Sequence, residues 1–494
     1  MTSSSATIES NDLATDPTAC YRALQSHDAR FDGRFFVGVK TTGIYCRPVC
    51  RARLPLQKNC TFFNNAPAAE RSGFRPCLRC RPETAPGWST TDISGQLAVA
   101  ASSIMQKLLH QNPRVTDIAE RLGVSARHLR RLFEDHFGVS PVDYLQTQRL
   151  LMAKRLLTDT SMSVTDIAGA AGFGSLRRLN ASMKERYNLS PSALRAHNLG
   201  GKAVQQTAAN GLQFSMPVRE PYDFEWMCSF FQSRSIEGLE RASQSGYQRV
   251  LSVAGPEGPL TGWIELTRQV DNTLKLTVSH SLAPAIAPVL VLTRQLFDLD
   301  ADPDSFLPTL GTLANANPGI RVPGAVSGFE IAVRAVLGQQ VTVKAARTLA
   351  ARFVTRFGEP CRFDDQPHLT HAFPSPEKIS RVRHSSIAKL GIISRRSETL
   401  RTLAKAIAAG QLDLSPGAPV ATTIEQLNSL PGIGDWTSQY MAMRALRWPD
   451  AFPAADYGVM KALQVETAPN ARRAAQQWSP WRAYAVMHLW ASLH

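Results

Sequence analysis

Two close pairs of cysteine residues constrain the fold of this chain more than any other feature of its sequence. Cys46 and Cys50 are separated by three residues, Cys77 and Cys80 by two, and 26 residues lie between the pairs. Each pair is able to hold one side of a tetrahedral Zn²⁺ ion, so the spacing predicts a small domain around one zinc ion with four cysteine ligands. Two disulfides or unrelated buried thiols are the alternatives, and the cytosolic character of the chain argues against disulfides.

The segment around these cysteines is strongly basic. Between residues 44 and 81 it holds eight basic residues and a single acidic one, Glu70. Four thiolates leave a Zn²⁺ centre with a net charge of about −2, which makes the sulfur atoms nucleophilic. Neighbouring arginines can bring phosphate groups to such a centre, and the candidates are Arg47, Arg51, Arg53 and Arg75.

The segments Thr41-Thr-Gly-Ile-Tyr-Cys-Arg-Pro-Val-Cys-Arg-Ala-Arg53 and Gly73-Phe-Arg-Pro-Cys-Leu-Arg-Cys80 resemble the zinc domain of Ada-type DNA-methylation sensors. The resemblance implies that Cys46 takes a methyl group irreversibly from a methylphosphotriester in the DNA backbone. It also implies that Thr42, Arg53 and Arg75 approach that backbone. The methyl group of a neutral phosphotriester suits direct displacement, because a phosphate diester is a good leaving group.

The 494 residues are enough for three or four domains, and their net charge of +15 is unevenly distributed. Basic residues outnumber acidic ones by 26 to 16 over residues 1–200 and by 21 to 14 over residues 301–494, with 8 against 10 between them. Two basic regions favour a polyanionic partner over a merely basic surface. No run reaches the ~18 apolar residues of a membrane helix, and the start lacks the plan of a signal peptide, so we expect a cytoplasmic protein without a membrane partner.

Residues 96–196 predict helices with an internal repeat. Residues Thr116–Ala119 recur as Thr165–Ala168, and each copy places a short helix and a glycine turn before an arginine-rich helix. This is the order of a helix-turn-helix, although a plain helical bundle is an alternative. The pair resembles the AraC-type DNA-binding domain that follows the zinc domain in Ada-type regulators. Residues expected to contact DNA are Arg127, His128, Arg130 and Arg131 in the first copy and Arg177 and Arg178 in the second, whose departures from the family pattern leave its base readout open.

The segment Leu430-Pro-Gly-Ile-Gly434 precedes a helix expected over Trp436–Leu446. Its glycines permit a tight turn whose N–H groups can bind phosphate, although many helical hairpins use glycine. Asp456 follows Gly434 by 22 residues. This combination resembles the helix-hairpin-helix base-excision glycosylases, and over residues 212–494 the resemblance extends to the AlkA-type 3-methyladenine glycosylases. Supporting motifs are Pro221–Trp226, Val336–Gln340 and Pro480–Trp490.

The resemblance implies that the chain hydrolyses the bond between deoxyribose and an N-alkylated purine of the 3-methyladenine or 7-methylguanine class. Asp456 would stabilise the oxocarbenium-like sugar, and a helix cap is its alternative role. Aromatic faces suit a flipped cationic base, although any single aromatic is more often part of a core. The implied pocket residues are Trp436, Tyr440, Tyr457, Trp490 and Phe230. Gly432 and Gly434 would bind the DNA backbone, and Gln340 stands where some relatives carry a leucine wedge.

Family motifs that the sequence lacks narrow the expected type of glycosylase. Lyase relatives carry a Schiff-base lysine where this chain has Trp436, which implies a monofunctional glycosylase. No cysteine follows Cys361, so no iron–sulfur cluster is expected, and no organic cofactor is expected either. The Pro-Cys-His-Arg motif of O6-methylguanine methyltransferases is absent from the sequence.

We therefore expect a multidomain chain, mainly α with α+β parts. The expected order is a disordered tail (1–18), an α+β zinc domain (19–88), an all-α double helix-turn-helix domain (92–198), a linker (199–211), a sheet-plus-helix domain (212–300) and an all-α helix-hairpin-helix domain (301–494). Expected partners are double-stranded DNA, as operator and as alkylated DNA, and RNA polymerase. The chain is expected to be a monomer associated with a bacterial-type nucleoid. A regulator whose glycosylase-like half only binds DNA is the alternative function.

Overall fold

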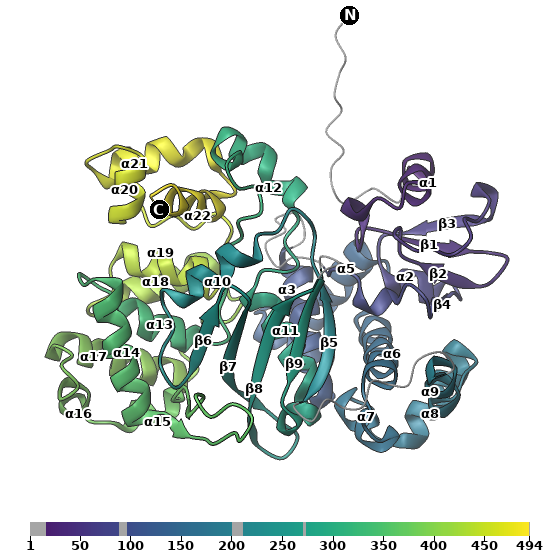
Figure 1. The fold of residues 1–494 in the computed structure, drawn as a ribbon, viewed down its shortest axis with the longest axis horizontal. Helices are drawn as coiled ribbons and strands as arrows, with labels where there is room; N and C mark the ends of the chain where they lie inside the picture. Colours follow the sequence, from purple (N-terminus) through teal and green to yellow (C-terminus); the bar gives the residue numbers. More distant parts are fainter. Residues whose placement is uncertain (1–15, 88–95, 200–210, 270–272, 494) are drawn as a thin grey trace, which may run out of the picture. The chain divides into compact units, whose positions relative to one another are not determined.

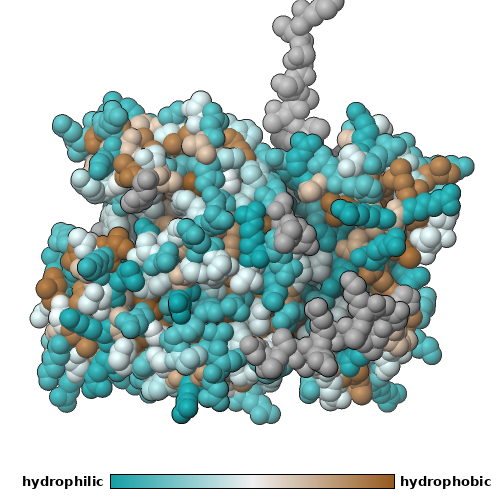
Figure 2. Space-filling view, viewed as in Figure 1, coloured by the Kyte–Doolittle hydropathy of each residue, from teal (hydrophilic) through white to brown (hydrophobic). Residues whose placement is uncertain are grey.

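The computed structural model describes residues 16–87, 96–199, 211–269 and 273–493. They form two compact units, the first built mainly from residues up to 199 and the second mainly from residues after 210. The expected linker lies almost wholly outside the described residues, as does the expected tail apart from residues 16–18, where the first helix already begins. No helix in the described ranges is long and apolar enough to span a membrane. On the face drawn in Figure 2, hydrophobic side chains occur in small groups among hydrophilic ones.

A small four-stranded sheet forms the N-terminal part of the first unit (Figure 1). Its strands, in spatial order, are β3 (Cys60–Phe63), β1 (Phe36–Val39), β2 (Ile44–Cys46) and β4 (Arg75–Pro76). It is accompanied by α1 (Pro17–Gln25) and α2 (Ala66–Arg71). One of its clusters of buried residues consists of three cysteines with Leu24 and Val37, and partly buried side chains such as Ile44 and Phe62 pack against it. So small an apolar core indicates that the cysteines and their ligand carry much of the stability of this part.

The rest of the first unit is helical and contains the expected repeat. The helices are α3 (Gln96–Lys107), α4 (Val115–Arg121), α5 (Ala126–Phe137), α6 (Pro141–Asp159), α7 (Val164–Ala170), α8 (Leu176–Tyr187) and α9 (Pro191–Leu199). Helices α5 and α8 begin alike, because Ser125 and Ser175 each accept a hydrogen bond from the backbone N–H three residues later. Each helix buries three side chains at intervals of four residues, so that one face packs inward and the opposite face is solvated. The predicted double helix-turn-helix is confirmed.

A buried carboxylate joins the sheet to these helices. Glu70, on α2, accepts hydrogen bonds from the hydroxyl groups of Tyr45 at 3.1 Å, Tyr187 at 3.0 Å and Thr147 at 3.3 Å. Burial raises the pKa of Glu70 to about 7, and the hydrogen bonds oppose the shift only in part. Ion pairs formed by Lys154 with Glu83 and by Arg81 with Asp159 strengthen the same contact.

Glu70→Gln should change how the stability of the first unit depends on pH. The folded pKa, about 7, exceeds the ordinary value of 4.5, so the stabilisation contributed by Glu70 is complete below about pH 4.5 and is lost as pH rises through 7. We expect the difference in unfolding free energy between wild type and variant to change by about 3 kcal/mol over this range, with the wild type becoming relatively less stable at higher pH. Urea unfolding at a series of pH values measures it.

Asp117→Asn is the matched control, since this half-exposed carboxylate pairs with Arg114, which lowers its pKa below the usual range. The difference in unfolding free energy between wild type and this variant should hardly depend on pH over the same range. A difference between wild type and Glu70→Gln that stays constant with pH would contradict the account of Glu70.

The second unit begins with a five-stranded sheet, antiparallel from β9 to β6. Its spatial order is β5 (Leu212–Pro217), β9 (Thr273–Val278), β8 (Pro259–Arg268), β7 (Gly246–Ala254) and β6 (Glu240–Ser243). Helix α10 (Phe224–Gln232) packs against β6 and β7. The expected sheet and helix of this part are present, and Asp223 caps the start of the helix.

Helices make up most of the remainder. They are α11 (Ile286–Leu296), α12 (Pro303–Leu310), α13 (Gly328–Leu337), α14 (Val343–Phe357), α15 (Pro376–Arg381), α16 (His384–Ala388), α17 (Ser394–Ala408), α18 (Val420–Ser429), α19 (Asp435–Arg444), α20 (Tyr457–Ala462), α21 (Ala468–Ala474) and α22 (Arg482–Ala491), with a small hairpin of β10 (Glu359–Pro360) and β11 (His371–Ala372). Helix α13 is almost wholly buried, and it packs against α14, α17 and α19 (Figure 1). This arrangement holds the hairpin between α18 and α19 firmly in place.

Candidate functional site

The four paired cysteines come together at one end of the small sheet. Strand β2 ends at Cys46, and its parallel pairing with β4 places Tyr45 beside Pro76, next to Cys77. The four sulfur atoms lie within 4.8 Å of one another. Tetrahedral Zn–S bonds of about 2.3 Å require sulfurs about 3.8 Å apart, so the cluster fits one Zn²⁺ ion.

The arginines near this cluster divide into two groups. Arg47 is buried in an ion pair with Asp32 and donates hydrogen bonds to the Cys80 carbonyl oxygen at 3.1 Å and to Thr84 Oγ1 at 2.8 Å. It therefore holds the cysteine loops together, and the expectation that it approaches phosphate is wrong for this conformation. By contrast, Thr42 and Arg53 are exposed and Arg75 is half-buried, as surface contacts to DNA require.

The two arginine-rich helices present equivalent side chains to solvent. Arg127 and Arg177 are each the second residue of their helix, so Arg127 corresponds to Arg177 and His128 to Arg178. Arg127, Arg177 and Arg178 are exposed. His128 is half-buried, and its ring nitrogen Nδ1 lies 3.1 Å from the Arg131 guanidinium. Arg130 and Arg131 are also exposed. Both helices thus offer positive charge on their solvated face.

The two glycines of the hairpin between α18 and α19 differ in the space around them. Gly432 has φ +87°, and a Cβ atom there would lie 2.2 Å from Thr399 Oγ1. Gln339 donates a hydrogen bond to its carbonyl oxygen at 3.0 Å, which fixes the turn. Gly434 has open space where a Cβ atom would be, and it starts α19 without a side-chain cap. The first N–H groups of α19 therefore remain available for an anion such as a DNA phosphate.

Two alanine substitutions should separate these roles. Gly432→Ala should destabilise the second unit by about 1–3 kcal/mol, because the residue needs a positive φ and meets Thr399. Gly434→Ala should leave stability nearly unchanged yet weaken duplex binding by placing a methyl group where a phosphate must approach. Thermal unfolding and DNA titration measure the two effects, and equal destabilisation by both variants would contradict the distinction.

Asp456 lies at the base of a cavity of about 1360 Å³ that also reaches the hairpin. Trp436 Nε1, on α19, donates to Oδ2 at 2.9 Å, and Trp490 Nε1, on α22, donates to Oδ1 at 2.9 Å. The backbone N–H of Val459 also donates to Oδ1, at 3.0 Å, so Asp456 caps α20 as well. The helix-cap role and the cavity-lining position therefore occur together in one half-buried carboxylate.

Four of the five predicted pocket aromatics lie close together. Trp436 stacks on Tyr440 with ring centroids 5.5 Å apart, and Tyr440 lies 6.5 Å from Trp490. The ring of Phe230 is nearly parallel to that of Trp490, at 6.5 Å and 16°. Tyr457 differs, because it is 76% exposed at the rim of the cavity. Gln340 is exposed, lines the same cavity and has φ +51°.

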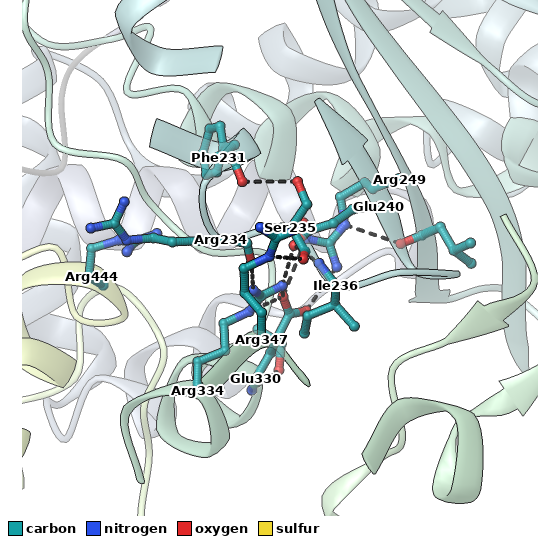
Figure 3. A network of polar contacts seen from close by, with 12 residues as sticks. Phe231, Arg234, Ser235, Ile236, Glu240, Arg249, Glu330, Arg334, Arg347 and Arg444 are labelled. Carbon is teal, nitrogen blue, oxygen red and sulfur yellow. Dashed lines mark hydrogen bonds and ion pairs between the residues drawn. The ribbon is translucent and has the colours of Figure 1, made fainter. Parts of the chain in front are cut away.

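A buried network of charges beside this cavity is not evident from the sequence (Figure 3). Glu330 accepts hydrogen bonds at 2.8 Å from both Arg249 and Arg334, and Glu240 accepts one at 2.6 Å from Arg334. Two carboxylates thus balance two guanidinium groups, and the network ties α13 to the edge of the five-stranded sheet. The only local signal is the spacing of four between Glu330 and Arg334, which many solvated helices share.

The fold and these sites define a DNA-binding regulator joined to a helix-hairpin-helix DNA glycosylase. Four family models match in order: the metal binding domain of Ada over residues 19–83, a helix-turn-helix domain over 118–197, the AlkA N-terminal domain over 213–327 and the HhH-GPD superfamily base excision DNA repair protein over 333–477.

Similar proteins carry the same combination. The chain is 36% identical, over 96% of its length and 96% of the relative, to a protein of Mycobacterium tuberculosis named probable bifunctional transcriptional activator/DNA repair enzyme AlkA. It is 35% identical to DNA-3-methyladenine glycosylase 2 of Escherichia coli, over 56% of this chain and 96% of that protein. The chain belongs to the family of bifunctional transcriptional activator/DNA repair enzymes of the AlkA type.

Proposed function

We propose that the second unit is a monofunctional glycosylase that releases N-alkylated purines, of the 3-methyladenine and 7-methylguanine class, from double-stranded DNA. The observation that carries this proposal is the Asp456 carboxylate, which two indole N–H groups hold inside an aromatic cavity beside a phosphate-binding hairpin. The name of the Escherichia coli relative supports the same substrate class. The alternative, a half that only binds DNA, gives no role to a carboxylate held in this way.

The chemistry follows from these groups. The alkylated base leaves with the electron pair of its bond to C1′, and positive charge develops on the sugar. Three N–H groups donate hydrogen bonds to the Asp456 carboxylate and hold it in place, and its negative charge stabilises that sugar. Water then adds its oxygen to C1′ and releases a proton to solvent. No lysine amine stands at Trp436 to form a covalent intermediate, and the aromatic faces attract the cationic base.

We further propose that the first unit senses methylated DNA backbone through Cys46. Its sulfur attacks the methyl carbon of a methylphosphotriester, a C–S bond forms, and the phosphate diester leaves with the electrons of the broken C–O bond. Zn²⁺ held by Cys46, Cys50, Cys77 and Cys80 would keep the thiols ionised at neutral pH. Methylation removes one negative charge from the cluster near Arg53 and Arg75.

The loss of this charge should strengthen sequence-specific DNA binding. At about 7 Å and an effective dielectric constant of about 20, one charge acts on a phosphate with about 2 kcal/mol, which solvent screening reduces to about 1 kcal/mol. This corresponds to a several-fold gain in affinity. The activator would then recruit RNA polymerase, and we propose that it works as a cytoplasmic, nucleoid-associated monomer.

Mass analysis of the full chain after incubation with methylphosphotriester DNA tests the transfer. We expect one added methyl group, located on Cys46 by peptide mapping. Binding of both forms to a duplex selected from random sequence, at low and high salt, tests the switch. The advantage of the methylated form should shrink as salt rises. An advantage independent of salt would reject the electrostatic account, and equal affinity would reject the switch.

A further inference from the structure

The cavity around Asp456 contains a cation stacked on one of its aromatic walls. Arg234 follows the end of α10, and its side chain turns back so that its Cζ atom lies 3.9 Å from the centre of the Phe230 ring. Its Nη1 donates hydrogen bonds to Ser233 Oγ at 2.7 Å and to the Phe230 carbonyl oxygen at 3.3 Å. These contacts hold a flat cation at cation–π distance from a predicted base-pocket ring.

Arg444, on α19, brings a second cation to the same ring. Its Cζ atom lies 5.0 Å from the centre of Phe230 and 5.7 Å from that of Tyr440. It is buried, and it donates hydrogen bonds to the Tyr440 hydroxyl at 2.8 Å and to the Gly324 carbonyl oxygen at 3.0 Å. Figure 3 shows Arg234 extending towards Arg444, away from the carboxylates that Arg249 and Arg334 contact.

The charges at this wall do not balance. The carboxylates of Glu240 and Glu330 form ion pairs with Arg334 and Arg249, respectively. Among the described residues, neither Arg234 nor Arg444 forms an ion pair with a carboxylate. Burial lowers the pKa of Arg234, but a guanidinium stays protonated in proteins. Two cations, Arg234 and Arg444, thus line the cavity with the single carboxylate of Asp456, whose charge also acts on Arg234.

We propose that Arg234 is a specificity-determining residue of the base pocket, where its guanidinium disfavours a cationic base relative to a neutral base of similar size. A cationic base must share the Phe230 ring with another cation and meets two like charges. A neutral base with ring-nitrogen or oxygen acceptors can instead accept hydrogen bonds from the guanidinium. This inference rests on the proposed glycosylase function, since it takes Phe230 as a wall of the base pocket.

The test compares two duplexes of one sequence that differ in a single base, the cationic 7-methylguanine and the neutral 1,N6-ethenoadenine. Arg234→Gln in the full chain should raise the ratio of kcat/KM for the cationic over the neutral base by about tenfold. Arg234→Lys keeps the charge and should stay near the wild-type ratio. Arg234→Met, which keeps the apolar stem, should reproduce the shift if the glutamine variant does not fold.

Arg347→Gln is the matched control. Arg347 is an exposed arginine on the rim of the same cavity, where it donates to the Ser235 carbonyl oxygen at 3.1 Å. Loss of this side chain should change kcat/KM for both bases by the same factor, as loss of a contact to DNA phosphate would. The proposal would be overturned if Arg234→Gln changed kcat/KM for both bases by the same factor. It would also be overturned if the wild type released only the cationic base. Wild-type release of neither base would overturn the glycosylase function instead.

Discussion

Asp456→Asn should lower the rate of base release by about 10³-fold while leaving the affinity for duplex DNA nearly unchanged. The substitution removes the negative charge that stabilises the sugar as the base departs. It also places an amide N–H₂ group beside an indole N–H of Trp436 or Trp490, where both groups are donors. Single-turnover base release from methylated DNA and binding to the same duplex measure the two quantities.

Asp435→Asn supplies a control from the same hairpin. Its carboxylate is about half exposed and pairs with Arg472 at 3.2 Å, so its loss should have little effect on either quantity. Thermal unfolding of the Asp456→Asn variant shows whether its cap of α20 is weakened. Near-normal turnover by a folded variant would restrict Asp456 to the role of a helix cap.

Loss of the four-cysteine metal site should unfold the small sheet and leave base release measurable. Apparent binding free energies of structural zinc are about 10–16 kcal/mol, and three of the four cysteines belong to a buried cluster whose other buried members are Leu24 and Val37. In Cys77→Ser we expect loss of one equivalent of zinc and fast proteolysis within residues 16–87. Metal analysis, limited proteolysis and the base-release assay measure these outcomes.

Cys60→Ser is the matched control, because this thiol lies outside the four-cysteine metal site and contacts the Leu56 carbonyl oxygen at 3.5 Å. Zinc content and proteolysis should remain as in the wild type. If chelation abolished base release at the same rate as it removed zinc, the two units would be one cooperative structure, contrary to this expectation.

Features that depend on spacing along the chain could be predicted from the sequence. The cysteine pairs, the helix-turn-helix repeat and the glycine hairpin followed by Asp456 all belong to this class, because local geometry determines them. The helix after the hairpin was expected over residues 436–446 and runs from Asp435 to Arg444. It ends two residues before the predicted end, with Ala445 as its C-cap residue.

Features that depend on contacts between distant segments could not be predicted. Arg47 resembles its exposed neighbours in sequence, yet Asp32 from another loop buries it. Glu70 was visible only as the single acid of a basic segment, and its partners Thr147 and Tyr187 lie far along the chain. Arg234 likewise reaches the cavity only because α10 packs beside α19 and α22, which charge and periodicity do not reveal.

The carboxylate of Glu70 also has a consequence for DNA geometry. Its hydrogen bonds connect Tyr45, which directly precedes the proposed methyl acceptor Cys46, to Tyr187, the last residue of the second arginine-rich helix. The strand and the helix are therefore tied to one carboxylate. On B-DNA, one added base pair shifts a phosphate by about 3.4 Å along the axis and turns it by about 35°. Under the proposed methyl transfer, with α8 in a groove of the same duplex, the phosphate nearest Cys46 and that groove must keep a constant separation in base pairs, so the phase of the double helix becomes part of what this protein recognises.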